Sequence, residues 1–389
     1  MDLFDFDRQV ERRGTGALKW EKYAERDVIP LWVADMDFSS PPSVLEALRQ
    51  RVEHGVFGYA QAPGELVEVI RERLSRLYGW QIEAEWLIWL PGLVTGLNIT
   101  CRAVGEVGTD VLTNIPIYPP FLSAPELSDR QTVPVPLVEQ QGRWAIDFDR
   151  LEQAVTPRTR LFLLCNPHNP TGRVFNRDEL GKLAAFCETH DLVLCSDEIH
   201  CDLILDPDCR HLPAASLDPA TADRTITLMA PSKTFNLPGL GCSFAIIGNP
   251  LLRRRFLRAM AGIVPHVNLF GYAAALAAYR DGGPWLEELL IYLRGNRALV
   301  EQAISAIPGL TMLPGEATYL AWIDARQLPT SDPAAFFEQA GVGLSDGAEF
   351  GVPGFVRLNF GCPRSLLRQG LERMVRAVAG LEGPARERR

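Results

Sequence analysis

The sequence predicts an α/β fold with a mostly parallel central sheet in a large domain and a smaller α+β domain. Between about residues 86 and 250, short apolar runs alternate with helical patterns, as expected for strands covered by helices on both faces. Beyond residue 268 the pattern changes to long helices with a few strands. The chain has 389 residues, more than a typical domain of roughly 150. We therefore expect a large domain at 43–283 and a small domain made of 1–42 with 284–389.

Apolar runs and helical spacing place the elements in order. Six runs are expected to form buried strands, at 86–90, 111–115, 161–165, 192–195, 225–229 and 243–247. Apolar residues three or four apart predict helices from residue 42, at 63–79, 93–104, 177–190, 269–279 and 284–307, and from 365. Two further strands are expected at 318–323 and 355–360. Parallel sheets bind ligands at the carboxyl ends of their strands, so functional residues are sought there.

Composition excludes several classes of protein. Hydrophobic residues make up 47% of the chain and charged residues 22%, a globular mixture. The net charge of −9 would repel nucleic acid and anionic lipid, so neither is expected as a partner. No apolar run approaches the roughly 18 residues of a membrane span, and the first residues lack a signal-peptide pattern, which favours the cytoplasm. The eight cysteines form no Cys-x-x-Cys pair and are expected to be reduced core residues, without a metal site.

Lys233 is the first candidate catalytic residue. It follows the strand at 225–229, within the segment Ala-Pro-Ser-Lys-Thr-Phe-Asn at 230–236. A half-buried pocket would disfavour the charged amine, and a neutral lysine can form a Schiff base. The alternative is an ordinary solvated lysine.

Asp197 is the second candidate, at the end of the strand at 192–195. Its carboxylate could hold a proton on a pyridine nitrogen, which would make the ring an electron sink. The alternative is a helix N-cap or loop carboxylate. His200 follows three residues later and could hydrogen-bond a ring substituent or cap a turn.

Two turns complete the candidate site. Asn169 lies in Asn-Pro-His-Asn-Pro-Thr-Gly at 166–172, where the prolines would aim its amide at a phenolic oxygen. Gly92 lies in Leu-Pro-Gly-Leu-Val-Thr-Gly at 90–96, where amide groups at a helix N-terminus could bind a phosphate. Either segment taken alone could be a simple connection.

Together these segments resemble fold-type I pyridoxal-phosphate enzymes of the class I/II aminotransferase family, over nearly the whole chain. The stretches at 31–38, 54–59 and 197–200 resemble its C–S lyase branch, which cleaves cystathionine. The resemblance implies a pyridoxal 5′-phosphate cofactor and an obligate homodimer. It also implies a β-elimination that splits cystathionine or related cysteine S-conjugates into a thiol, pyruvate and ammonia. An aminotransferase is the main alternative, and a catalytically inactive binding module is a third.

The resemblance also assigns roles to single residues. Lys233 resembles the Schiff-base lysine, Asp197 the partner of the pyridinium nitrogen and Asn169 the donor to the phenolate oxygen. Arg357 resembles the arginine that binds the substrate α-carboxylate, although a strand arginine could also be solvated. The remaining cofactor positions are the ring-stacking Tyr118, the phosphate-binding Gly92, Leu93, Val94 and Ser232, and Tyr59, which would reach the phosphate of the neighbouring subunit.

Two positions depart from the common aminotransferase pattern. Gly241 stands where many members have a phosphate-binding arginine, so phosphate binding is expected to depend on backbone amides and hydroxyls. His200 stands where many have tyrosine. Both departures fit the lyase branch better than a plain aminotransferase.

Overall fold

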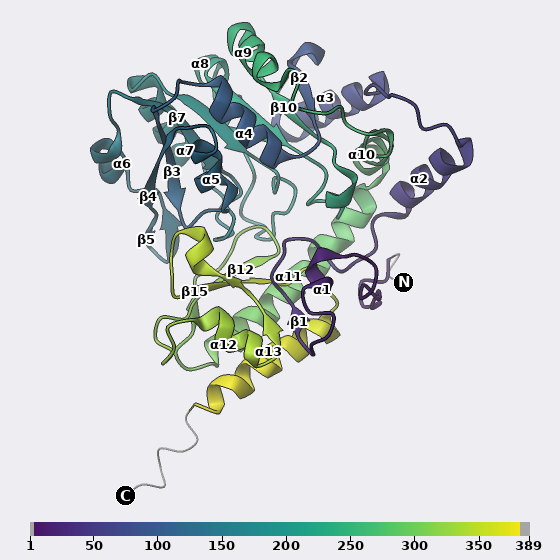
Figure 1. Ribbon diagram of the computed structural model, residues 1–389, viewed down its shortest axis with the longest axis vertical. Coiled ribbons are helices and arrows are strands. Elements are labelled where there is room, and N and C mark those ends of the chain that lie inside the picture. Colours follow the sequence, from purple (N-terminus) through teal and green to yellow (C-terminus); the bar gives the residue numbers. More distant parts are fainter. Residues whose placement is uncertain (1–3, 382–389) are drawn as a thin grey trace, which may run out of the picture.

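A seven-stranded sheet organises the larger part of the molecule (Figure 1). The computed structural model describes residues 4–381. The sheet order is β2-β10-β9-β8-β7-β3-β4, and every strand runs parallel except β10, which is antiparallel to both neighbours. The strands are β2 (Leu87–Leu90), β3 (Asp110–Ile115), β4 (Gln131–Pro136), β7 (Thr159–Cys165), β8 (Val193–Asp197), β9 (Thr225–Met229) and β10 (Ser243–Ile246). This confirms the predicted mostly parallel sheet.

Helices cover both faces of this sheet. Leu161 and Leu163 of β7 pack in one core cluster with α4 (Leu93–Ala103), α5 (Pro120–Glu126) and α9 (Pro250–Met260). Phe162 and Leu164 point to the other face, where α6 (Phe148–Ala154) and α7 (Arg177–Thr189) pack. This two-sided burial explains why the strand is apolar throughout rather than alternating. At the β2–β10 end, the sheet packs against α3 (Gly64–Tyr78) and α10 (Leu269–Asp281), and α2 (Pro42–His54) contacts α10.

A second, four-stranded antiparallel sheet has the order β11-β12-β15-β14. Its strands are β11 (Thr311–Met312), β12 (Leu320–Asp324), β14 (Ser345–Asp346) and β15 (Phe355–Asn359), with helices α11 (Gly283–Ser305), α12 (Pro333–Gln339) and α13 (Arg364–Ala379). The N-terminal segment joins this part: it holds α1 (Leu18–Glu21), and β1 (Ile29–Pro30) pairs in parallel with β13 (Val342–Gly343). One core cluster contains Leu31 and Val356 but also Phe235 and Ala278. The division of the chain at residues 43 and 284 stays a prediction.

The sequence did not indicate several short elements. β4 was missed because most of it is partly or fully exposed and it contains two prolines, which suits its place at the edge of the sheet. The sequence also did not indicate α1, α5, α6, α9, α12, β1, β11, β13 and β14. The remaining unexpected elements are β5 (Val138–Gln140), β6 (Arg143–Ala145), α8 (Pro219–Asp223) and the 3₁₀ turns η1 (Ala84–Trp86), η2 (Ala214–Ser216), η3 (Pro238–Leu240) and η4 (Gly347–Phe350).

All eight cysteines are free thiols, and all but the half-buried Cys209 are buried, which confirms the core interpretation. Within residues 4–381, no helix is long and apolar enough to cross a membrane. The same residues contain no cluster of three or more His, Cys, Asp or Glu side chains placed to hold a metal ion.

Candidate active site

A cavity of about 440 Å³ lies at the carboxyl ends of the parallel strands, between the large sheet and β15. Ten of the eleven predicted site residues line it: Gly92, Leu93, Val94, Tyr118, Asn169, Asp197, His200, Ser232, Lys233 and Arg357. Tyr59 does not, and its side chain is fully exposed. The structure therefore brings together residues from six separate segments of the chain.

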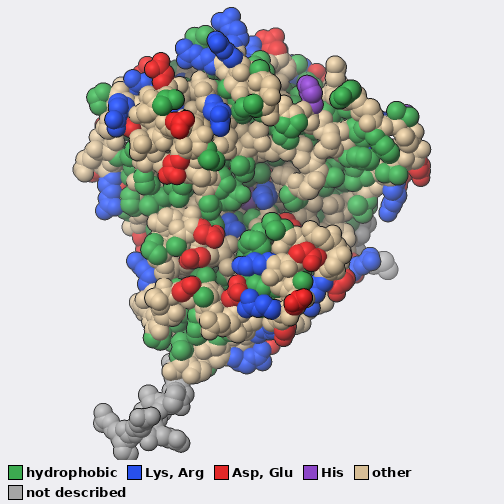
Figure 2. Space-filling model, in the orientation of Figure 1, with side chains coloured by type: hydrophobic (Ala, Val, Ile, Leu, Met, Phe, Trp, Pro, Cys, Tyr) green, Lys and Arg blue, Asp and Glu red, His purple; other side chains and the backbone are tan. Residues whose placement is uncertain are grey.

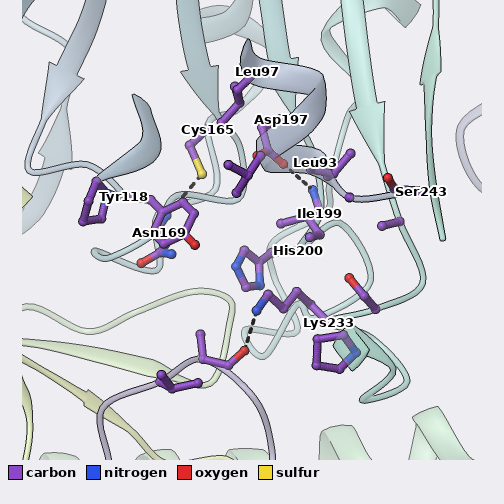
Figure 3. Close-up of a pocket in the computed structure, with 18 of the residues that line it drawn as sticks. Leu93, Leu97, Tyr118, Cys165, Asn169, Asp197, Ile199, His200, Lys233 and Ser243 are labelled. Atoms are coloured by element: carbon purple, nitrogen blue, oxygen red, sulfur yellow. Dashed lines mark hydrogen bonds between the residues drawn. The ribbon is translucent and has the colours of Figure 1, made fainter. Parts of the chain in front are cut away.

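Lys233 enters the cavity from the turn after β9 (Figure 3). Its Nζ donates a hydrogen bond to the carbonyl oxygen of Ala34, which also accepts from the Tyr319 hydroxyl at 3.0 Å. Burial, aided by the nearby Arg357 guanidinium, lowers the pKa of Lys233 to about 8. The amine is thus neutral in an appreciable fraction of molecules near neutral pH, as a nucleophile or base requires.

Asp197 ends β8 on the opposite side of the cavity in the same view (Figure 3). Its Oδ1 accepts a hydrogen bond from the backbone N–H of Ile199 at 3.1 Å. Burial raises the pKa of Asp197 to about 7, and the adjacent Glu198 acts in the same direction. A cationic N–H in the cavity would compensate this buried carboxylate, which suits a protonated ring nitrogen.

Asn169 and Arg357 are joined directly. The Nη1 of Arg357 donates to Asn169 Oδ1 at 2.9 Å, and its Nη2 donates to the Trp32 carbonyl at 2.8 Å and to Ser345 Oγ at 3.2 Å. The Nε of Arg357 is buried without a partner in the described chain. Because the oxygen of Asn169 is used by Arg357, its NH₂ group is the part available to donate to a ligand.

The loop that carries Asn169 is fixed to its surroundings. Asn166 donates its backbone N–H to the Asp197 carbonyl at 2.9 Å, and its Oδ1 accepts from the Phe175 backbone at 3.0 Å. Gly172 has φ +70°, and a Cβ there would lie 2.8 Å from the Ala317 carbonyl oxygen. Only glycine fits this turn, which holds the loop against the second sheet.

His200 and Tyr118 flank the centre of the cavity. His200 is buried, its Nδ1 has no partner among the described residues, and burial lowers the pKa of the imidazole well below its usual value. The ring is therefore neutral and can accept or donate one hydrogen bond to a ligand. Tyr118 presents an aromatic ring to the same space.

The phosphate-binding prediction falls on the start of α4. The N–H groups of its first turn have no acceptor within the helix, and the helix dipole favours an anion there. Gly241 also lines the cavity, in a left-handed conformation with φ +59°, and a Cβ there would lie 3.1 Å from the Pro91 carbonyl oxygen. A side chain at position 241 therefore has little room, and phosphate binding by backbone amides and the Ser232 hydroxyl stays a prediction.

These groups fit pyridoxal phosphate. The buried carboxylate of Asp197 matches a ring N–H, the free amide of Asn169 matches a phenolate oxygen, and the first turn of α4 matches a phosphate. Two cavity-lining residues, His200 and Arg357, each carry a buried nitrogen, Nδ1 and Nε, that has no hydrogen-bond partner among the described residues. The donor set therefore matches the cofactor that the resemblance implied.

The sequence missed other residues of the site. Asn359 donates to the carbonyls of Val33 and Asp35, and Asn236 donates to those of Met36 and Phe38, so both hold the N-terminal segment over the cavity. Asn359 had a signal, since it lies two residues after Arg357 on an apolar strand and so shares its face. Glu349, which also lines the cavity, had no such signal because it lies in the short 3₁₀ turn η4, which has no apolar periodicity.

The chain is similar in sequence and structure to several known proteins. The family model for aminotransferases of class I and II matches residues 26–374. The cystathionine beta-lyase PatB of Bacillus subtilis is 38% identical over 387 residues, which cover 96% of this chain and 100% of that protein. The crystal structure of OvoB is 50% identical, with a TM-score of 0.95, covering 96% of this chain and 99% of that one. Cystalysin from Treponema denticola, which contains a pyridoxal 5′-phosphate cofactor, is 34% identical, with a TM-score of 0.92, covering 97% of this chain and 100% of that one.

Proposed function

Because this chain belongs to the class I and II aminotransferase family, we propose that it is a pyridoxal-phosphate-dependent C–S β-lyase. Its substrates are L-cystathionine or related cysteine S-conjugates, and its products are a thiol, pyruvate and ammonia. The observation that carries the proposal is the gathering of Lys233, Asp197, Asn169 and Arg357 around one cavity. The full-length similarity to a cystathionine beta-lyase supports the lyase reaction over amino transfer.

The cofactor, when bound, supplies an electron-withdrawing ring that stabilises negative charge at the substrate Cα. Asp197 keeps the proton on the ring nitrogen, because a buried carboxylate favours a cationic partner. Asn169, whose oxygen is taken by Arg357, would donate its amide N–H to the phenolate oxygen, and Tyr118 would contact the ring. His200 supplies one further hydrogen bond to a ring substituent or to the substrate.

Arg357 and Lys233 act on the substrate. Arg357 binds the α-carboxylate through its charge and an N–H group that the protein leaves free, and this holds the substrate with its Cα near Lys233. The neutral amine of Lys233 removes the Cα proton. The Cβ–S bond then breaks, and its electron pair leaves with the sulfur as a thiolate. Addition of water to the remaining three-carbon fragment yields pyruvate and ammonia.

Amino transfer is the second candidate, because the family model is named for it. Both reactions begin with the same proton removal, but amino transfer requires a 2-oxo acid as acceptor. Cytoplasmic location stays a prediction.

The test of the site is the Lys233→Ala variant of the purified holoenzyme. The unmodified protein is expected to be yellow, and the variant should lose pyruvate release and the lysine-dependent part of the visible absorption. Arg326→Lys, an exposed arginine paired with Asp324, serves as the matched control and should keep both. Full turnover by Lys233→Ala would show that another group removes the proton.

We also propose that the active enzyme is a homodimer in which Tyr59 reaches the phosphate of the neighbouring subunit. The segment after α2 exposes Val56, Phe57 and Tyr59, with 62%, 57% and 108% of their surface accessible. Hydrophobic side chains are concentrated on the side of the molecule where α2 and α10 lie (Figure 2). Exposed apolar patches of this kind are typical of protein interfaces.

A complementation experiment tests this arrangement. If Tyr59 acts across the interface, each site contains Lys233 of one subunit and Tyr59 of its neighbour. In a mixed dimer of one Tyr59→Phe subunit and one Lys233→Ala subunit, one site then carries both substitutions and the other site carries neither. Mixing the two variants should therefore restore about a quarter of wild-type activity after subunit exchange. No recovery in a verified mixed dimer would show that Tyr59 acts within its own subunit.

A further inference from the structure

The outer part of the cavity carries one charged side chain that the mechanism does not use. The charged residues that line the cavity are Asp197, Lys233, Arg357 and Glu349. The first three have roles in the proposed reaction. Glu349 makes no hydrogen bond or ion pair within residues 4–381, and its side chain is exposed. The cavity thus has a negative charge at its mouth that is free to meet a ligand.

The backbone that carries Glu349 is fixed. It lies in η4, which Asp346 caps by accepting a hydrogen bond from the Ala348 N–H at 3.0 Å. The turn closes at Gly351, with φ +84°, whose N–H donates to the Ala348 carbonyl at 3.1 Å. Ile117 donates its N–H to the Phe350 carbonyl at 3.1 Å, which ties the turn to the segment that carries Tyr118. The glutamate is therefore presented from a defined place beside Tyr118.

Glu349 does not act as the counter-ion of Arg357. The guanidinium of Arg357 lies over the Phe350 ring at 4.8 Å and donates to Asn169, Trp32 and Ser345, and no ion pair joins it to Glu349. Glu349 is nonetheless near enough to favour the charged guanidinium, so it raises the pKa of Arg357 against the larger lowering by burial. The two groups therefore lie in the same region but leave each other free to bind different parts of a substrate.

A bound cysteine S-conjugate has its α-carboxylate at Arg357 and its Cα near Lys233. Glu349 lines the same cavity and, unlike the buried Asp197 and Arg357, is exposed, so the group beyond sulfur is expected to extend toward it on the way to solvent. Resting on the proposed function, we propose that Glu349 is a specificity residue that selects substrates whose departing thiol carries a positive charge, such as an ammonium or a protonated imidazole. Substrates with a neutral leaving group are processed less well because they lack this attraction. Substrates with an anionic leaving group are processed least well because the carboxylate of Glu349 repels them.

The test compares leaving groups that differ in charge. The substrates are S-(2-aminoethyl)-L-cysteine, the neutral S-(2-hydroxyethyl)-L-cysteine of equal length, and the anionic S-carboxymethyl-L-cysteine. For each, kcat and KM are measured from pyruvate release by the holoenzyme. Glu349→Gln should lower the preference for the aminoethyl over the hydroxyethyl substrate about two- to tenfold, mainly through KM, as expected for one partly exposed ion pair. Glu349→Lys should favour the carboxymethyl substrate.

Two further measurements separate this role from a structural one. Glu139→Gln, on the exposed strand β5, is the matched control and should leave all three substrates unchanged. The preference of the wild type should shrink as ionic strength rises from about 0.01 to 1 M. Binding without turnover is measured by calorimetry with L-lysine and L-norleucine, which lack sulfur and cannot undergo the elimination. Glu349→Gln should weaken only lysine binding.

The outcomes are distinct. A wild-type preference that Glu349→Gln leaves intact, or an equal loss for all three substrates, would overturn the inference while leaving the lyase in place. If neither L-cystathionine nor any of the three conjugates yields pyruvate, the proposed function fails, and the inference that rests on it fails with it.

Discussion

Arg357→Lys tests how the site binds the substrate carboxylate. A guanidinium has five N–H donors, and Asn169, Trp32 and Ser345 use three of them, which leaves one N–H on Nη1 and the one on Nε. These two point to different sides of the guanidinium, so the α-carboxylate accepts from one of them. Lysine keeps the charge but cannot bind the carboxylate together with Asn169, Trp32 and Ser345. A hydrogen bond to a charged group contributes about 1.5–3 kcal/mol. Loss of one such bond should lower kcat/KM about 10- to 150-fold.

The assay is pyruvate release from L-cystathionine over a range of substrate concentrations. An analogue with an α-carboxamide in place of the carboxylate should have a kcat/KM lower by a similar factor with the wild type. With Arg357→Lys the decrease should be much smaller, because this variant already lacks the interaction with the carboxylate. Arg326→Lys is the control, and circular dichroism checks that the variants are folded. The carboxylate role of Arg357 would be refuted if Arg357→Lys lowered kcat/KM less than about threefold. It would also be refuted if the carboxamide analogue lowered kcat/KM equally with both enzymes.

The other predictions concern protonation and stability. In the cofactor-free protein, burial raises the pKa of Asp197 to about 7, so the folded chain holds a proton there that the unfolded chain loses above about pH 4. The free energy of unfolding, measured by urea titration, should therefore fall as the pH rises from about 4 to about 7. Asp197→Asn should remove that part of the fall. For Lys233, burial lowers the pKa to about 8, so stability should rise between pH 8 and the ordinary lysine pKa of 10.5, and Lys233→Met should remove that rise. Arg73 pairs with the buried Asp202, which also accepts a hydrogen bond from Thr234 at 3.0 Å. Arg73→Met should therefore cost about 3–5 kcal/mol of unfolding free energy, and adding Asp202→Leu should recover most of it; an additive loss would contradict this account.

The sequence predicted those parts of the molecule in which one local pattern decides the structure. The buried strand at 225–229 was found with its observed bounds, because both of its faces are covered and its run of Ile, Leu, Met and β-branched Thr carries no charged residue. Lys233 and Asp197 both line the cavity, and each had a local signal because Asp197 ends such a strand and Lys233 lies in the turn after one. The resemblance to a known family added Arg357 and Tyr118, which no local pattern identified as functional.

The missed features depend on contacts between distant segments. β4 carries polar residues and prolines, since it is an edge strand whose place is set by pairing with β3. The hydrogen bonds from Asn236 and Asn359 to the N-terminal segment join residues about 200 and 320 positions apart in the chain. Glu349 acquires its position only when η4 packs beside Tyr118. No spacing rule connects such pairs.

We expect this site to eliminate a thiol rather than transfer an amino group. The most direct measurement mixes the purified holoenzyme with L-cystathionine in the absence of any 2-oxo acid and follows pyruvate, ammonia and free thiol together. A β-lyase releases all three in equal amounts over many turnovers. Absence of all three, followed by amino transfer once a 2-oxo acid is added, would contradict this expectation.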